Sequence, residues 1–171
     1  MIYIVRHGQT DWNLLTKRQG HTNIPLNAEG IKQANMLKEK LKDVSFDVVF
    51  SSPLDRAIKT AEIVTDKDII IDNRLIERNN GKFEGLTREQ INNLKIQDDY
   101  SDEKYGLESL DHLQERANSF LKDVLQKYAN KNILIVTHGG LIINLRCYLD
   151  GIPDDISSYA LSNCDIYIYN N

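Results

Sequence analysis

The chain has 171 residues, of which 41% are hydrophobic and 27% are charged, and its 21 basic and 25 acidic side chains give a formal net charge of −4. A chain of this size and composition is expected to form one domain over residues 1–171. We expect neither a disordered chain nor a protein of two domains. Binders of nucleic acid or anionic membranes usually carry a basic stripe, which is absent here, so we expect neither partner, and any anionic ligand must be held by a local cluster of positive groups.

Five short runs are typical of β-strands, and segments of helical period separate them. The predicted strands cover Ile2–Val5, Phe46–Ser51, Ile69–Ile71, Ile133–Thr137 and Asp165–Tyr169. Strands that alternate with helices form βα units, so an α/β fold with a mainly parallel sheet is predicted. The last run alternates apolar and polar residues, and we expect an edge strand there.

Two helices are predicted in the first half of the chain. Asn27 is a capping residue, and it precedes an apolar face made of Ile31, Ala34, Leu37 and Leu41. Ser52 is a capping residue that stands before a proline at the first helical position. A second helix is therefore predicted from Pro53 to about Asp66.

Three more helices are predicted in the second half. Thr87 opens a capping-box pattern and a short helix. The clearest amphipathic helix begins near Ser109, and the last helix begins at Gly139-Gly140. The apolar face of the amphipathic helix comprises Leu110, Leu113, Ala117, Phe120, Leu121, Val124, Leu125 and Tyr128. Residues 77–108 are polar and irregular, so we expect an excursion from the sheet that covers a site.

The first residues lead straight to Arg6 and lack the basic and apolar regions of a signal peptide. The most apolar window, Ile133 to Leu145, is too short to span a bilayer. We therefore expect a cytoplasmic protein. Cys147 and Cys164 form no CxxC pair and stand in apolar segments, so we expect buried, reduced thiols.

Charged side chains stand at the carboxyl ends of three predicted strands. Arg6-His7 follows the first strand, His138 follows the fourth, and Arg56 lies in the first turn of the helix after the second. Open parallel sheets bind ligands outside these ends, so the four side chains should converge, although 131 positions separate the histidines (138 − 7). Guanidinium groups suit a tetrahedral oxyanion, so phosphate is the predicted ligand. A histidine held at one ring nitrogen can then attack phosphorus through the other.

Ordered motifs run from residue 1 to about residue 140. They are Arg6-His7-Gly8-Gln9-Thr10-Asp11-Trp12-Asn13, Gln19-Gly20, Pro25-Leu26-Asn27-Ala28-Glu29-Gly30, Ser51-Ser52-Pro53-Leu54-Asp55-Arg56-Ala57, Leu75-Ile76-Glu77 with Gly81 and Glu84-Gly85, and Val136-Thr137-His138-Gly139-Gly140. These resemble the RHGxTxxN, QG, PLTxxG, SSPLxRA, LxE...GxxEG and VTHGG segments of the histidine phosphatase superfamily, the phosphoglycerate mutase-like proteins. The resemblance implies a three-layer α/β/α sandwich with a mainly parallel central sheet and an antiparallel edge strand.

The resemblance also implies roles for single residues. It makes His7 the phosphorylated nucleophile, and Arg6, Arg56 and His138 the rest of the charged, catalytic phosphate pocket. The other substrate-binding positions that it implies are Asn13, Gln19, Gly20 and Gly139. Glu77 matches the proton donor of the family, and a departing alkoxide does need a proton from a nearby carboxyl group. The resemblance implies no metal and no cofactor.

Several polar residues have a structural interpretation. Glu84 is a second carboxylate in the excursion, and we expect it to be structural. His21 and His112 are expected at the surface or on a helix face. Ser109, with Arg116 seven residues on (116 − 109), resembles a GES segment of the family, but Ser109 is also placed to cap its helix, and the two interpretations stand open.

Three activities are weighed. A mutase must shield its phosphohistidine from water, which favours a larger cover. Only 60 residues separate Glu77 from His138 (138 − 77 − 1), fewer than in the cofactor-dependent mutases that the chain resembles. This favours hydrolysis of a small phosphorylated metabolite, with alpha-ribazole phosphate, sugar phosphates and phosphoglycerates as candidates. Phosphoglycerate mutase is the alternative, and a non-catalytic phosphate-binding module is the second. The identity of the substrate depends on side chains of the cover, and Arg78, Lys82 and Arg88 are candidates to contact it.

Overall fold

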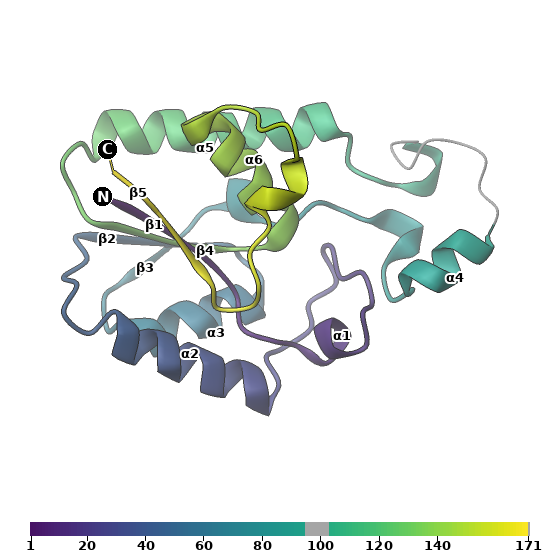
Figure 1. Cartoon of the computed structure of the whole chain (residues 1–171), viewed down its shortest axis with the longest axis horizontal. Helices are drawn as coiled ribbons and strands as arrows, with labels where there is room; N and C mark the ends of the chain where they lie inside the picture. The colour runs from purple at the N-terminus through teal and green to yellow at the C-terminus, as the bar shows by residue number, and fades with distance from the viewer. Residues whose placement is uncertain (95–102, 171) are drawn as a thin grey trace.

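The computed structural model describes residues 1–94 and 103–170. The predicted excursion at 77–108 therefore lies partly outside the described residues. Within those ranges, five strands form one sheet between layers of helices (Figure 1). The strands are β1 (Ile2–Arg6), β2 (Val48–Ser51), β3 (Ile69–Ile71), β4 (Ile133–Thr137) and β5 (Ile166–Tyr169).

The sheet has the strand order β3-β2-β4-β1-β5. Parallel pairing joins β1 to β4, with Arg6 opposite Thr137, and β2 to β4, with Ser51 opposite Val136. The β5 strand pairs antiparallel with β1 at the edge. The carboxyl ends of β1, β2 and β4 thus lie side by side. The predictions of a mainly parallel sheet and of an antiparallel edge strand are confirmed.

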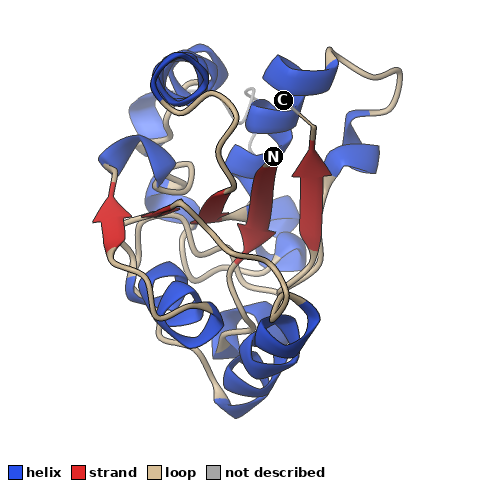
Figure 2. Ribbon diagram, turned by 90° about the vertical axis from the view of Figure 1, so that its left-hand side faces the viewer, coloured by secondary structure: helices blue, strands red, loops and turns tan. Residues whose placement is uncertain are grey.

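Helices cover both faces of the sheet (Figure 2). On one face lie α2 (Ala28–Lys40) and α3 (Asp55–Val64), and on the other lie α5 (Leu110–Lys127) and α6 (Gly139–Asp150). The short helices α1 (Asp11–Leu14) and α4 (Arg88–Asn93) stand beyond the carboxyl ends of the strands (Figure 1). Single turns of 3-10 helix cover Asn73–Leu75, Gly81–Phe83, Glu103–Tyr105 and Ile156–Tyr159. The three-layer α/β/α architecture is confirmed.

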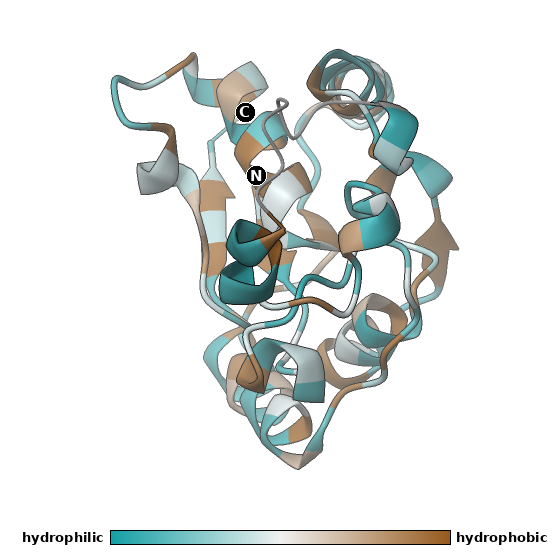
Figure 3. Ribbon diagram, turned by 90° about the vertical axis from the view of Figure 1, so that its right-hand side faces the viewer, coloured by the Kyte–Doolittle hydropathy of each residue, from teal (hydrophilic) through white to brown (hydrophobic). Residues whose placement is uncertain are grey.

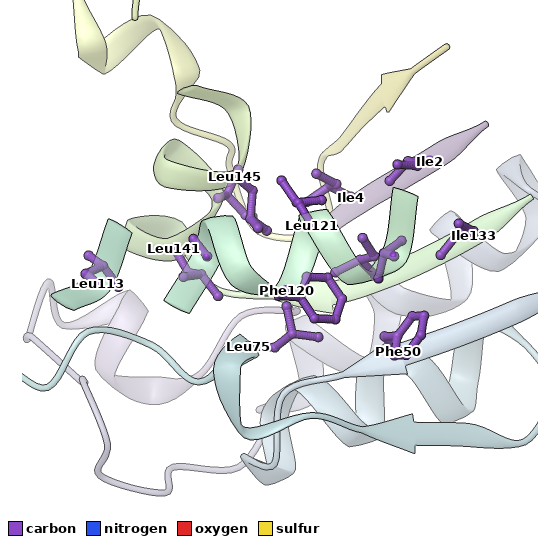
Figure 4. Close-up of a cluster of buried hydrophobic side chains, with 14 residues drawn as sticks. Ile2, Ile4, Phe50, Leu75, Leu113, Phe120, Leu121, Ile133, Leu141 and Leu145 are labelled. Carbon is purple, nitrogen blue, oxygen red and sulfur yellow. The ribbon is translucent and has the colours of Figure 1, made fainter. Parts of the chain in front are cut away.

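Two buried clusters hold the layers together. Toward α5 and α6 the strands present Ile2, Ile4, Ile133 and Ile135, which pack with Phe120, Leu121, Leu141 and Leu145 (Figure 4). Toward α2 and α3 they present Tyr3, Val5, Leu134 and Val136. Successive side chains of a strand point to opposite faces, and helices cover both faces here, so β1 and β4 are apolar at nearly every position.

Several predicted boundaries and faces need correction. The strand that was predicted from Phe46 begins at Val48. The helix predicted from Pro53 begins at Asp55 without a side-chain cap, because the Ser52 hydroxyl lies at the strand end and accepts from Leu54 N at 3.3 Å. Ile31 and Leu110, both predicted on apolar faces, are 43% and 56% exposed. The free thiols Cys147 and Cys164 are half-buried and not fully buried.

Other local predictions are confirmed. Asn27 caps α2 by accepting from Gly30 N at 2.9 Å, and Thr87 caps α4 in a capping box. The described part of the excursion, seen from its own side in Figure 3, has a small core of Phe83, Ile91 and Leu107, so it is less irregular than predicted. Over the described ranges, no helix combines the length and the apolar character needed to cross a bilayer.

Candidate active site

The register of β1 and β4 brings the two predicted histidines together. Because Arg6 lies opposite Thr137, the next residues of the two strands, His7 and His138, are neighbours. His7 N donates to Thr137 O at 3.0 Å, and the ring centroids of the two histidines are 5.0 Å apart. The predicted convergence of these rings is confirmed.

The His7 ring is fixed at one nitrogen. Its Nδ1 lies 2.7 Å from Gly8 O. A carbonyl oxygen only accepts, so Nδ1 carries the proton and Nε2 of the neutral ring keeps its lone pair. Burial first, and then the charges of Arg56 and Arg6, lower the pKa of His7 well below its usual range. The ring is therefore neutral at neutral pH, with a nucleophilic nitrogen.

Arg56, in the first turn of α3, is fully buried, and each of its nitrogens makes a hydrogen bond. Nε donates to His138 Nδ1 at 3.3 Å, and the two terminal nitrogens donate to Thr22 O and Gly20 O, both at 2.8 Å. Burial lowers the pKa of Arg56 to about 10, so the guanidinium stays charged at neutral pH. Because His138 Nδ1 accepts, its Nε2 carries the proton and donates to Ser52 Oγ at 2.7 Å.

Arg6, at the end of β1, has a different environment. One terminal nitrogen donates to Leu161 O at 2.7 Å. Its Nε is buried and has no hydrogen-bond partner in the part of the chain that the structure describes, and a Cβ built on Gly139 would lie 3.6 Å from it. Burial lowers the pKa of Arg6, while the charge of Glu77 opposes that change. Buried donors without a partner are rare and costly, so this one suits an anionic ligand.

Three backbone N–H groups hold the Glu77 carboxylate. Gly140 N donates to Oε2 at 3.0 Å, and Leu141 N and Arg78 N donate to Oε1 at 3.2 and 2.8 Å. Gly140 and Leu141 belong to the first turn of α6, where free N–H groups favour an anion. A Cβ on Gly140 would lie 2.7 Å from Oε1, so only glycine permits this close approach.

Arg116, a residue of α5, holds the main chain at Glu77. Arg116 forms a two-pronged ion pair with Glu108, at 2.7 and 2.9 Å, and the side chains are 10% and 8% exposed. Its terminal nitrogens also donate to Arg74 O at 2.7 Å, to Ile76 O at 2.6 Å and to Glu77 O at 3.1 Å. The Arg116 guanidinium thus fixes the whole segment that leads to Glu77.

A cavity of about 260 Å³ lies among these groups. The predicted site residues with charged or imidazole side chains that line it are Arg6, His7, Arg56 and Glu77. The other predicted site residues that line it are Asn13, Gln19, Gly20 and Gly139. His138 is not among the described lining residues, since it is fully buried behind the wall against Arg56 and Ser52.

Sequence reasoning missed several lining residues. Lys17 and Arg18 line the cavity and directly precede Gln19-Gly20. Their place next to that motif could have indicated that they lie at the site. Asn80, from the excursion, also lines it. The apolar lining residues Ile143 and Leu161 belong to no motif and are brought in by α6 and by the chain that returns to β5.

The structure shows what the remaining polar residues of the sequence analysis contact. Ser109 caps α5 by accepting from His112 N at 3.1 Å. Glu84 accepts from the backbone N–H groups of His21 and Thr22 at 2.9 and 2.8 Å, as the structural interpretation expects. The exposed His21 lies nearer the site than predicted, because its Nε2 is 2.9 Å from Glu77 O. Lys82 and Arg88 are exposed and are not among the described residues that line the cavity.

Comparisons with known proteins agree with this fold. A family model described as the histidine phosphatase superfamily (branch 1) matches residues 2–170. The chain is 40% identical over 166 residues to the Uncharacterized phosphatase PhoE of Bacillus subtilis, covering 95% of this chain and 83% of that protein. It is 29% identical over 177 residues to a 2,3-bisphosphoglycerate-dependent phosphoglycerate mutase of Cytophaga hutchinsonii, covering 95% and 83%.

Among solved structures, the phosphoserine phosphatase of Entamoeba histolytica in complex with 3-phosphoglyceric acid superimposes with a TM-score of 0.81 at 31% identity, covering 96% of this chain and 87% of that one. The chain belongs to the histidine phosphatase superfamily.

Proposed function

We propose that this enzyme hydrolyses phosphate monoesters of small metabolites through a phosphohistidine on His7. The observation that carries the proposal is the neutral imidazole, held by Gly8 O at Nδ1, in a cavity that the guanidiniums of Arg6 and Arg56 help to line. Nε2 of His7 attacks phosphorus while the P–O ester bond breaks. Water then attacks phosphorus, the P–N bond breaks, and inorganic phosphate leaves. Arg6 and Arg56 stabilise the charge on the equatorial oxygens.

Glu77 carries the proton in both steps. In the first step the protonated carboxyl group of Glu77 gives its proton to the leaving oxygen, the alcohol departs, and Glu77 becomes the carboxylate that the three N–H groups hold. In the second step it takes a proton from the attacking water, which returns Glu77 to its starting form. Its position supports this role, because the carboxylate lines the cavity and the N–H groups of Gly140, Leu141 and Arg78 fix its orientation.

The remaining roles follow from where the side chains stand. The cavity-lining residues that we assign to substrate binding are Asn13, Gln19, Gly20 and Gly139. His138 acts from behind the cavity wall, where its Nδ1 accepts from Arg56 Nε and keeps that guanidinium in place. This differs from the direct phosphate contact that the motif resemblance implies.

Hydrolysis is favoured over the mutase alternative by two observations. The relative with 40% identity is named as a phosphatase, and the segment between Glu77 and His138 is short for a cover that must exclude water. Because 3-phosphoglyceric acid is named with the Entamoeba histolytica structure, phosphoglycerates stay among the candidate substrates, beside sugar phosphates and alpha-ribazole phosphate. A phosphate-binding module without turnover is the remaining alternative.

We also propose that residues 1–171 act as a single domain in the cytoplasm, with the excursion at 77–108 covering the site. The cluster of Phe83, Ile91 and Leu107 supports an ordered cover, because it gives the described part of the excursion its own apolar packing. The free thiols of Cys147 and Cys164 suit a reducing compartment.

A metabolite screen without added metal tests the proposal, with the His7→Ala variant alongside. We expect release of inorganic phosphate from at least one small monoester by the wild type, and a rate reduced by about 10³-fold or more in the variant. Turnover that persists undiminished in His7→Ala refutes the nucleophile assignment. Conversion of 3-phosphoglycerate to 2-phosphoglycerate that outpaces hydrolysis would establish the mutase instead, and phosphate binding without any turnover would establish the binding module.

A further inference from the structure

A second cavity, of about 430 Å³, adjoins the active-site cavity. We name it the apolar groove, after six of its lining residues: Leu110, Leu113, Ile143, Cys147, Ile152 and Ile156. They come from α5, from α6 and from the chain that follows α6. Gly140 and Ile143 line both cavities, so the groove begins where the active-site cavity ends.

The shared residues lie on the leaving-group side of the proposed reaction. Gly140 N donates to Glu77 Oε2 at 3.0 Å, and Glu77 is the group that protonates the departing oxygen. The alcohol of the substrate starts at that oxygen. An alcohol too large for the active-site cavity therefore has a path past Gly140 and Ile143 into the groove. This step rests on the proposed function.

The chemistry of the groove selects the kind of alcohol. Leu110, Ile152 and Ile156 are 56%, 78% and 52% exposed, so three large apolar side chains face solvent around one hollow. Exposed apolar side chains that gather in this way mark a binding site more often than scattered ones do. The described lining residues also include one charged side chain, that of Arg78, and the amide side chains of Gln114 and Asn144. Arg78 Nε donates to Glu108 O at 2.9 Å, and Asn144 Nδ2 donates to Gly140 O at 3.0 Å.

We infer that the apolar groove binds the alcohol portion of the substrate, and that this portion is an uncharged alkyl chain or aromatic ring. A carboxylate there would meet mainly aliphatic side chains, which do not repay the loss of its hydration. The enzyme would accordingly prefer apolar phosphate esters to phosphorylated carboxylic acids such as 3-phosphoglycerate.

A series of n-alkyl phosphates from methyl to hexyl tests this inference. A fully buried methylene is worth about fourfold in binding, and the groove is open to solvent on one side, so we expect about twofold in kcat/KM per added methylene. The five methylenes that distinguish hexyl from methyl phosphate should then raise kcat/KM by about 30-fold. The kcat/KM for hexyl phosphate should also exceed the kcat/KM for 3-phosphoglycerate.

Two exposed residues allow a variant that leaves the core intact. The double variant Ile152→Ser, Ile156→Ser should lower the hexyl-to-methyl ratio of kcat/KM by about fourfold or more. The matched control is Ile70→Ser, Ile71→Ser on β3, where the side chains are 45% and 46% exposed and lie outside both cavities. The control should keep the wild-type ratio.

Calorimetric binding of methylphosphonate and hexylphosphonate separates the groove from catalysis, because it needs no turnover. Tighter binding of hexylphosphonate in the wild type, weakened in the double variant, supports the groove even if no ester is hydrolysed, in which case the proposed function alone fails. Equal binding and equal kcat/KM along the series overturn the groove while His7-dependent hydrolysis keeps the proposed function. A double variant that changes the sedimentation coefficient and not the ratio would make the groove a subunit interface and overturn the inference.

Discussion

Replacing Arg116 with alanine should slow catalysis, because this side chain holds the main chain of Glu77 in place. Five hydrogen bonds leave the Arg116 guanidinium: two to the Glu108 carboxylate and three to the carbonyls of Arg74, Ile76 and Glu77. Arg116 contributes no atom to the lining of the cavity in the described part of the chain. We therefore expect its main effect on the reaction to pass through the position of Glu77.

The magnitude follows from these contacts. Loss of one partner from a buried ion pair costs about 3–5 kcal/mol of unfolding free energy. Glu108 keeps His112 Nδ1 at 2.7 Å and Asn79 N at 3.3 Å as partners, so we expect the lower end, about 3 kcal/mol. A shift of the reacting group by about 1 Å costs about 10²-fold in rate, and we expect that loss in kcat/KM for an alkyl phosphate.

The assay compares two leaving groups. Glu77 acts on the departing oxygen, and 4-nitrophenolate leaves without much help from an acid. Because Glu77 also serves the second step, which is the same for every ester, the comparison uses kcat/KM, which reports the steps up to release of the alcohol. Arg116→Ala should lower kcat/KM by about 10²-fold for an alkyl phosphate and by less than about tenfold for 4-nitrophenyl phosphate, the pattern also expected of Glu77→Gln. Arg116→Lys should restore part of the loss, because an ammonium keeps the charge but not the two-pronged geometry.

Arg74→Ala is the matched control. The Arg74 side chain pairs with Asp72 and Asp123 at 2.8 and 2.7 Å and is 31% exposed, so its removal should cost about 1 kcal/mol or less and leave the ratio between the two esters unchanged. Equal losses on both esters in Arg116→Ala would show that Arg116 stabilises the fold without positioning Glu77, and the reasoning would be refuted.

Three further results are expected. Burial lowers the pKa of His7 and of His138, so the stability that these neutral rings contribute is fully present above about pH 6.5 and is lost as the pH falls. The unfolding free energy should drop by up to about 1.4 kcal/mol per pH unit for each histidine, and less steeply in His138→Asn. Urea titrations at two pH values measure this change, and a flat wild-type profile contradicts it. Gly140→Ala should displace the Glu77 carboxylate and lower kcat for alkyl esters by about tenfold or more, with an unchanged circular dichroism spectrum; unchanged kcat would show that the close approach is dispensable. Thr60→Val should cost about 1–3 kcal/mol in urea unfolding, because Thr60 Oγ1 accepts the buried N–H that follows His7, at 3.0 Å; a cost near zero would speak against that bond.

The fold could be predicted because its signals are local. Alternating faces in β1 and β4 and the caps at Asn27, Thr87 and Ser109 depend on residues a few positions apart. The meeting of His7 with His138 also followed from sequence, since both stand one residue beyond parallel strands. Ser52 shows where such signals fail, because its hydroxyl accepts from both His138 Nε2 and Leu54 N at the strand end, and α3 begins later, at Asp55.

The contacts that tune the site could not be predicted in the same way. Arg116 reaches the Glu77 carbonyl across 39 positions, and the apolar groove combines α5, α6 and the chain beyond them. The spacing of Arg116 from Ser109 was visible in the sequence, but its contact with the Glu77 carbonyl was not, and no periodicity marks the groove. The protonated nitrogen of each histidine likewise depends on a partner, Gly8 O for His7 and Arg56 for His138, whose distance only the folded chain sets.

Trapping the phosphorylated enzyme tests the central claim most directly. Turnover of a radiolabelled monoester is quenched in alkali, which preserves phosphohistidine, and the labelled peptide is located by mass spectrometry and its phosphorus–nitrogen linkage by NMR. The account predicts label on Nε2 of His7, because Nδ1 is bound to Gly8 O at 2.7 Å, and no label in His7→Ala. Label on His138, label on Nδ1 of His7, or hydrolysis at the full rate with no labelled enzyme would contradict it.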